Sequence, residues 1–254
     1  EDAAWNTAIT DNFGALLQAN GSGLQVADVI RYPENTTDFT PFFNQAVASM
    51  EGRTGGFFTL MAHTGTRPTT QWAQQQVPLP FHGINVQAQD GRFNDLTNGA
   101  AESVVTFTSA ARAPLTPLTI PFVDTFAGSS INPGVDVPSY NSLHTYDSLR
   151  LLKAAAEGAG VLPNSPANTD AIIAELESYD GEKSFPSTTG AAAFFQRGET
   201  GVTPLYPGDL PHDLRFGGQF GSGVWIQWQD GEQVAIFPPV APDGETQSAT
   251  ALPI

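Results

Sequence analysis

The chain has 254 residues, 40% of them hydrophobic, which is enough to bury a core in one large or two smaller domains and excludes disorder along the whole length. Acidic residues outnumber basic ones by 26 to 10, for a formal net charge of −16. This charge repels phosphate backbones and anionic lipid head groups, so we expect no nucleic-acid partner and no membrane-surface partner. A hydrated acidic surface also resists salting-out. We therefore interpret the chain as halophilic, with an ordinary acidic secreted protein as the alternative.

Cysteine is absent, which excludes disulfides, thiolate metal sites and cysteine nucleophiles. No run approaches the roughly 20 apolar residues of a membrane helix, so we expect no membrane insertion by this segment. The first residue is Glu1 and not Met, which we interpret as a processed or truncated start.

Helical and extended patterns alternate over residues 1–110. We expect a first helix through Ile9 and Phe13 that ends at 20–23, then a strand at 24–32 and a helix capped by Asp38. A strand at 57–62, a helix at 69–76 and a strand at 81–86 should follow. One or two helical turns at 93–102 and a strand at 103–108 complete this part of the chain. This order predicts an α/β fold, a three-layer sandwich in which helices cover a parallel sheet. Ligands of such sheets bind beyond the carboxyl ends of the strands, here in the loops after Ala62 and Ile84.

The second half of the chain opens with a proline-rich stretch, residues 111–138, which predicts a connecting segment and no packed element. A helix is expected at 139–159, ended by Gly160, and another is expected to begin at 168–170. The inward residues of the first helix are expected to be Leu143, Tyr146, Leu149, Leu151, Leu152 and Ala155. Asp230-Gly231 predicts a type I′ turn between two strands, and the tail from 238 on is expected to be loosely attached.

Motifs for nucleotide phosphates, dinucleotides and a serine nucleophile elbow are absent. The four histidines, His63, His82, His144 and His212, have no metal-binding spacing. We therefore predict no catalytic residue, no metal and no cofactor. A dispersed hydrolytic site stays open as an alternative, because such residues need no common sequence motif.

Three stretches together resemble the type 1 periplasmic-binding-protein family, and within it the branched-chain amino-acid and amide solute-binding proteins of ABC transporters. They are residues 1–5 before an amphipathic helix, residues 32–43 (YPENTTDFTPFF) and residues 145–152 (TYDSLRLL), with the late Trp-Gln-Asp-Gly hairpin as the usual close of the family. The similarity extends from residue 1 to about residue 239. The family begins with a longer stretch that forms most of the first lobe and has no counterpart here, so the resemblance implies an incomplete first lobe.

The resemblance implies a periplasmic-binding-protein-like two-lobe architecture. Residues 1–124 would form lobe two, residues 125–217 the later part of lobe one, and residues 218–254 a hairpin that returns to lobe two, followed by the tail. Closure about the crossings would capture the ligand. The lobe-two wall of the cleft in this family uses an aromatic residue at the first helix and the loops after the second and third strands. Those positions here are Trp5, His63, Thr64, Gly65, Asn85 and Gln87.

Each of these residues also has a structural interpretation. Trp5 could cover the core beneath its helix, and Asn85 could be a turn residue at the end of a strand. Amino-acid binders of the family often carry an acid where Asn85 falls, and an amide cannot neutralise an ammonium group. Asn85 therefore favours a neutral amide or urea-like ligand over a simple amino acid.

The resemblance implies an extracytoplasmic solute-binding protein that is not an enzyme. Its partners would be a small polar solute (an amino acid, amide or urea-like molecule) and the subunits of an ABC permease. Its place would be the periplasm or the cell surface, with a lipid anchor on a missing N-terminus as one mode of attachment. The alternatives are a ligand-sensing receptor ectodomain and, as the weaker one, an α/β hydrolytic enzyme.

Overall fold

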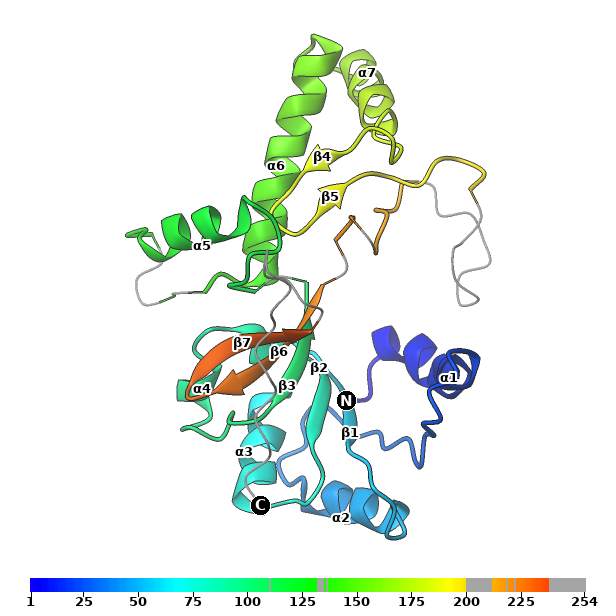
Figure 1. Ribbon diagram of the computed structural model, residues 1–254, viewed down its shortest axis with the longest axis vertical. Helices are drawn as coiled ribbons and strands as arrows, with labels where there is room; N and C mark the ends of the chain where they lie inside the picture. The colour runs from blue at the N-terminus through cyan, green and yellow to red at the C-terminus, as the bar shows by residue number, and fades with distance from the viewer. Residues whose placement is uncertain are drawn as a thin grey trace. The chain divides into compact units, whose positions relative to one another are not determined.

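The computed structural model describes residues 1–109, 111–131, 135, 137–199, 212–217, 219–221 and 223–237 (Figure 1). The chain divides into two compact units: Glu1–Thr108 with the hairpin from Trp225 on, and Ser109–Val224. The assignment of these units to two lobes stays a prediction. None of the helices formed by the described residues is both long enough and apolar enough to span a bilayer.

The first unit has the β–α–β order expected from its sequence pattern. Its elements are α1 (Ala4–Ala19), α2 (Thr40–Ser49), β1 (Phe57–Met61), α3 (Thr66–Gln74), β2 (Phe81–Asn85), a 3-10 turn η1 (Gln87–Gln89), α4 (Phe93–Leu96), β3 (Val105–Thr108), β6 (Val224–Gln229) and β7 (Glu232–Phe237). β1 and β2 pair in parallel, with Phe57 opposite Phe81 and Met61 opposite Asn85. The predicted parallel sheet is confirmed.

Helices cover both faces of this sheet. The ring of Phe57 lies 5.8 Å from that of Phe43 on α2, whereas the ring of its neighbour Phe58 stacks at 4.4 Å on Phe13 of α1. Successive side chains of a strand point to opposite faces, so α2 and α1 lie on opposite sides of β1. The α/β sandwich of three layers is thereby confirmed.

Two buried tryptophans pack in the core on the side of the sheet that α2 covers. Trp72 of α3 stacks on Phe81 at 5.5 Å and donates its indole N–H to the carbonyl of Leu79 at 2.9 Å. Trp228 of β6 is buried and donates its indole N–H to the carbonyl of Ala88 at 2.9 Å. Both rings therefore bury a large apolar area while their one polar atom stays satisfied.

The late hairpin forms as predicted. β6 and β7 pair antiparallel, with Gln229 opposite Glu232, and β3, β6 and β7 follow one another in a three-stranded sheet. The two turn residues have positive φ angles, 52° at Asp230 and 83° at Gly231, as a type I′ turn requires.

The strand predicted at 24–32 is wrong. These residues form no strand, and they leave Leu24, Val26 and Val29 exposed. Their alternating pattern is that of a strand, but a strand also needs a neighbour to receive its hydrogen bonds. Among the described residues, their one backbone hydrogen bond to another segment joins the Asp2 N–H to the Tyr32 carbonyl at 2.8 Å, and no strand pairs with them.

The described residues of the second unit form five helices and strands. They are α5 (Thr119–Ala127), α6 (Tyr140–Ala159), α7 (Pro166–Glu177), β4 (Phe185–Pro186) and β5 (Ala191–Ala192). α5 corrects the prediction that 111–138 holds no packed element, because Val123 is fully buried and Pro121 lies in the first turn, where a missing N–H does no harm. Gly160 ends α6 in the left-handed conformation, φ 69°, as predicted.

The inward face predicted for α6 is partly wrong. Leu143 and Ala155 are buried, but Tyr146, Leu149 and Leu152 are exposed. Asp147 takes the inward place instead, and its carboxylate accepts hydrogen bonds from the backbone N–H and the hydroxyl of Thr188, at 2.8 and 2.6 Å. The inward face of the helix therefore includes a carboxylate. The tail from 238 on, predicted to be loosely attached, lies outside the described residues.

Candidate functional site

The loops after β1 and β2 meet because the two strands are parallel and end side by side. Gln87, just after β2, bridges them. Its side-chain oxygen accepts hydrogen bonds from the N–H and the hydroxyl of Thr66, both at 2.7 Å, and its amide nitrogen donates to the carbonyl of His63 at 2.8 Å. Gln87 therefore sets the shape of the loop that leads from β1 into α3.

A carboxylate at Glu1 brings three of the predicted site residues together. It accepts hydrogen bonds from the backbone N–H of His63 at 3.0 Å, the hydroxyl of Thr64 at 3.1 Å and the indole N–H of Trp5 at 3.4 Å. The sequence argument missed Glu1 as a functional residue. Its loop partners lie more than 60 positions away, so no local pattern connects them.

Burial and hydrogen bonding set the charge state of this cluster. Burial alone would raise the pKa of the Glu1 carboxyl, but hydrogen bonds from the backbone N–H groups of His63 and Ala62, then from Trp5 and Thr64, together lower that pKa below its usual value. Burial raises the pKa of Tyr32, whose hydroxyl lies 2.8 Å from that of Thr64, to about 12. The site thus combines an ionised carboxylate with a neutral phenol at neutral pH.

The electrostatic field at the mouth of the site is negative. The Nδ1 atom of His63 lies 3.3 Å from a carboxylate oxygen of Glu1 and 3.7 Å from one of Glu34. The His63 side chain is 65% exposed, so it stands in solvent above the buried carboxylate. Such a field favours neutral or cationic ligand groups over anionic ones.

Asn85 and Gly65 lie next to the cluster around Glu1, at the ends of the same two loops. Asn85 is 1% exposed, and its side-chain oxygen accepts a hydrogen bond from the N–H of Ala88 at 3.2 Å. A Cβ atom placed on Gly65 would lie 1.9 Å from that same oxygen. The Nδ2 atom of Asn85 is buried and has no hydrogen-bond partner within the described residues, so both N–H donors of this amide stay unused.

Of the six residues predicted for the site, Trp5, His63 and Thr64 thus share the Glu1 carboxylate, and Gln87 joins them through the His63 carbonyl. Trp5 is 40% exposed beside them. Gly65 and Asn85 form the floor of the loop. Within the described residues, no group of three or more His, Asp or Glu side chains is placed to hold a metal ion.

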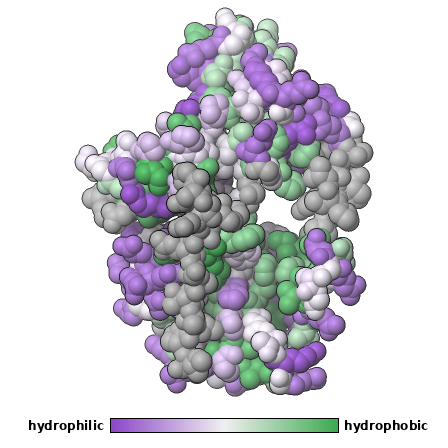
Figure 2. All heavy atoms as spheres, in the orientation of Figure 1, coloured by the Kyte–Doolittle hydropathy of each residue, from purple (hydrophilic) through white to green (hydrophobic). Residues whose placement is uncertain are grey.

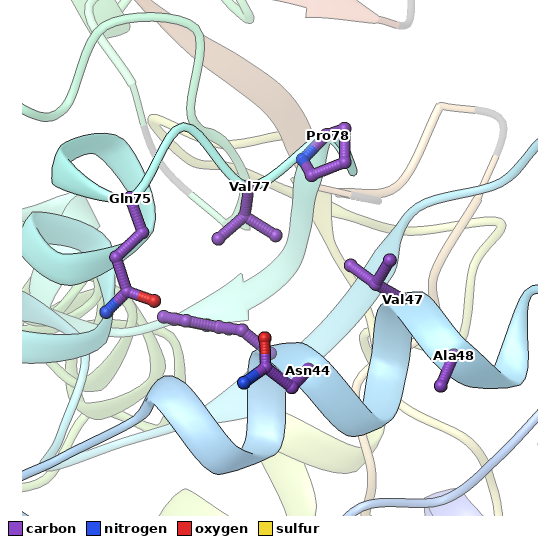
Figure 3. Close-up of a pocket in the computed structure, with 7 residues that line it drawn as sticks. Asn44, Val47, Ala48, Gln75, Val77 and Pro78 are labelled. Atoms are coloured by element: carbon purple, nitrogen blue, oxygen red, sulfur yellow. The ribbon is translucent and has the colours of Figure 1, made fainter.

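A separate depression of about 320 Å³ lies elsewhere on the first unit (Figure 3). It is lined by Phe43, Asn44, Val47 and Ala48 of α2 and by Gln75, Val77 and Pro78. Val77 and Pro78 precede β2, whereas the candidate site follows it, so the two lie at opposite ends of that strand. None of the six predicted site residues lines this depression.

Residues 1–212 match the sequence model of a family described as periplasmic binding protein. The chain belongs to the periplasmic binding protein family. This confirms the resemblance drawn from residues 1–5, 32–43 and 145–152. No protein with a curated description matches the sequence.

Three solved structures illustrate the similarity of the fold. An ABC transporter substrate-binding protein from Sphaerobacter thermophilus is 18% identical, with a TM-score of 0.66 over 96% of this chain and 59% of that one. A solute-binding protein from R. palustris in complex with benzoate is 16% identical, with a TM-score of 0.62 over 92% and 55%. A branched-chain amino acid ABC transporter protein from Thermus thermophilus with bound valine is 14% identical, with a TM-score of 0.57 over 88% and 55%. The chain therefore spans less than two thirds of the length of these structures.

Proposed function

We propose that this periplasmic binding protein captures a small polar solute outside the cytoplasm and delivers it to an ABC permease. The observation that carries this proposal is the cluster of Trp5, His63, Thr64 and Gln87 around the Glu1 carboxylate. It lies beyond the carboxyl ends of two parallel strands, where ligands of α/β sheets bind. The structures with bound valine and benzoate support a solute as the partner.

The chemistry of the cluster favours a neutral amide or urea-like ligand, with an amino acid as the second choice. Trp5 offers a partly exposed flat face to an apolar or cationic group. Glu1 and Glu34 disfavour a ligand whose only charge is negative, such as benzoate.

We propose binding without chemical conversion. In the described part of the chain, the His63 ring lies against two carboxylates and no hydroxyl. The Thr64 hydroxyl lies between the Glu1 carboxylate and Tyr32. Among the described residues, the cluster therefore lacks the pair of a histidine and a hydroxyl that activates a serine or threonine nucleophile. Attachment to the cell surface through a lipid belongs to the same proposal.

NMR titration of the chain with acetamide, urea, L-leucine and benzoate tests the proposal. Because all six candidate residues lie in one of the two units, we expect weak binding, with a Kd of about 1 mM for the amides and weaker binding of benzoate. Trp5→Ala and Gln87→Ala should each weaken amide binding by about tenfold, a loss of about 1.4 kcal/mol.

The control variant is Asn44→Ala, which alters the depression at the other end of β2 and should leave the affinity unchanged. Loss of binding in Asn44→Ala with full binding in Trp5→Ala would place the ligand in that depression. Nanomolar affinity for leucine would contradict the preference for neutral ligands. Release of ammonia from a bound amide would contradict a pure binding role.

A further inference from the structure

The two oxygens of the Glu1 carboxylate differ in how closely side chains and backbone hold them. Oε2 accepts hydrogen bonds from the backbone N–H of His63 at 3.0 Å and from the hydroxyl of Thr64 at 3.1 Å. At Oε1 the side-chain contacts are longer, 3.4 Å to the indole N–H of Trp5 and 3.3 Å to Nδ1 of the His63 ring. A charged N–H usually approaches a carboxylate to about 2.7–2.9 Å. The side of Oε1 that faces Trp5 and His63 is therefore loosely held.

The hydroxyl groups behind this carboxylate have a fixed hydrogen-bond direction. An ionised carboxylate only accepts, so Thr64 uses its one hydroxyl hydrogen toward Glu1. The neutral phenol of Tyr32, 2.8 Å away, must then donate to Thr64. Both hydroxyl hydrogens are used within the cluster, and what the cluster offers a solute here is an acceptor. A solute group that binds at Glu1 therefore has to be a hydrogen-bond donor.

The His63 ring already stands where such a donor would bind. Its Nδ1 atom lies 3.3 Å from Oε1 of Glu1 and 3.7 Å from Oε1 of Glu34. Because both neighbours are carboxylates, Nδ1 has to carry the hydrogen. The ring thus presents a planar N–H group to Glu1, which is the group that a primary amide or a urea carries.

Only the side chain of His63 is free to move. Its backbone N–H is bonded to Glu1, and its carbonyl accepts a hydrogen bond from Gln87 at 2.8 Å. The His63 side chain is 65% exposed, whereas that of Glu1 is 1% exposed. Exposed side chains change rotamer rapidly, and exposed ion pairs add little stability. Rotation about the Cα–Cβ bond of His63 therefore uncovers the buried carboxylate, at the end of the chain that Figure 1 shows beside β1.

We propose that the His63 ring is a gate over the Glu1 carboxylate, and that a planar N–H donor of the solute replaces it at Oε1. This inference rests on the proposed function and narrows the solute to a primary amide or urea-like molecule. Trp5 lies against the same oxygen and is 40% exposed, so its ring can stack on a planar group. The visible face of the first unit mixes hydrophilic and hydrophobic residues (Figure 2), and an amide with a short apolar part combines the same two characters.

A gate and a direct contact differ in the sign of their effect on affinity. Removing a side chain that contacts the solute weakens binding, whereas removing one that competes with the solute strengthens it. The measured affinity is the intrinsic affinity multiplied by the fraction of molecules whose gate is open. His63→Ala should therefore strengthen the binding of acetamide by about fivefold. Glu1→Gln, which replaces one acceptor oxygen by a donor, should weaken it by about tenfold.

NMR titration with acetamide and with N,N-dimethylacetamide, which has the same carbonyl but no N–H, tests the gate. The gain in His63→Ala should be confined to acetamide. His212→Ala is the matched control, because His212 is also half-exposed beside a carboxylate, 2.8 Å from Glu177, but lies in the second unit. It should leave both affinities unchanged. In the chain without ligand, scalar couplings should show rotamer averaging about χ1 of His63 and a single rotamer for the half-buried His82.

Weaker or unchanged acetamide binding in His63→Ala would overturn the gate while leaving the solute proposal in place. An equal gain for dimethylacetamide would overturn the N–H donor as the group that replaces the ring. A single χ1 rotamer of His63 in the free chain would overturn the gate whatever the titrations show. Absence of acetamide binding in the original chain and in His63→Ala would overturn the proposed function, and the gate with it.

Discussion

Gly65 is a residue where a single methyl group would disturb the candidate site. A Cβ atom there would lie 1.9 Å from the Oδ1 atom and 2.5 Å from the Cγ atom of Asn85, far inside contact distance. Asn85 is fully buried and has little room to move. We expect Gly65→Ala to lower the free energy of unfolding by about 1–3 kcal/mol, measured by urea denaturation.

The control is Gly14→Ala in the middle of α1. The nearest atom to a Cβ there is Cγ2 of Val26 at 3.9 Å, an ordinary contact, and alanine favours the helix. This variant should raise the free energy of unfolding by about 0.5–1 kcal/mol. Equal stability of Gly65→Ala and the original chain would contradict the close packing of Gly65 on Asn85.

The sequence was sufficient to predict which loops form the candidate site, but not the hydrogen bonds between their side chains. The parallel order of β1 and β2 places His63 and Gln87 at one end of the sheet, and this order follows from hydrophobic periodicity. The role of Glu1 depends on partners more than 60 positions away, which periodicity does not contain. Asn85 is polar at a strand end, but only the structure shows that its side chain turns into the protein.

The leucines of helix α6 differ in their exposure to solvent. Leu143 is 1% exposed, whereas Leu149 is 63% exposed. We expect Leu143→Ala to lower the free energy of unfolding of the second unit by about 2–5 kcal/mol, because it removes buried methyl groups and leaves a cavity. Leu149→Ala, the matched control, should change it by less than about 0.5 kcal/mol. Urea denaturation monitored by circular dichroism measures both, and equal effects would contradict the assigned face.

The same helix shows why its limits were easier to predict than its orientation. Gly160 ends it through local conformation alone. Its orientation depends on Asp147, which is buried because Thr188, 41 positions away, donates two hydrogen bonds to it. In the same way, the pattern at 24–32 predicts a strand. A strand also needs a paired neighbour, and a local pattern does not show whether one is present. Pairing across the chain is the information that the sequence argument lacked.

The whole molecule carries a formal charge of −16, which acts against compactness at low salt. Raising sodium chloride from about 0.1 to 1 M shortens the screening length from about 10 to 3 Å and weakens the repulsion between carboxylates. We expect the melting temperature at pH 7 to rise over this range. Differential scanning calorimetry measures the shift.

The matched control is the same titration near pH 4.3, the isoelectric point of the sequence. There the net charge is close to zero, and added salt should produce a much smaller rise. A melting temperature at pH 7 that falls with salt would contradict the interpretation of the chain as one adapted to a saline environment. Equal rises at the two pH values would point to a general salting-out effect.

The four tryptophans lie in different environments, so the intrinsic fluorescence of the protein can report on the candidate site. Trp72 and Trp228 are buried against aromatic neighbours, Phe81 and Phe93, so their emission is shifted to shorter wavelengths and shielded from dissolved quenchers. Trp5 is 40% exposed and stands beside His63, so it contributes the long-wavelength edge of the spectrum. Trp225 is half-buried against Phe58 and Phe107, so Trp5 is the most exposed of the four, and a change of intensity at that edge reports chiefly on the candidate site without an attached dye.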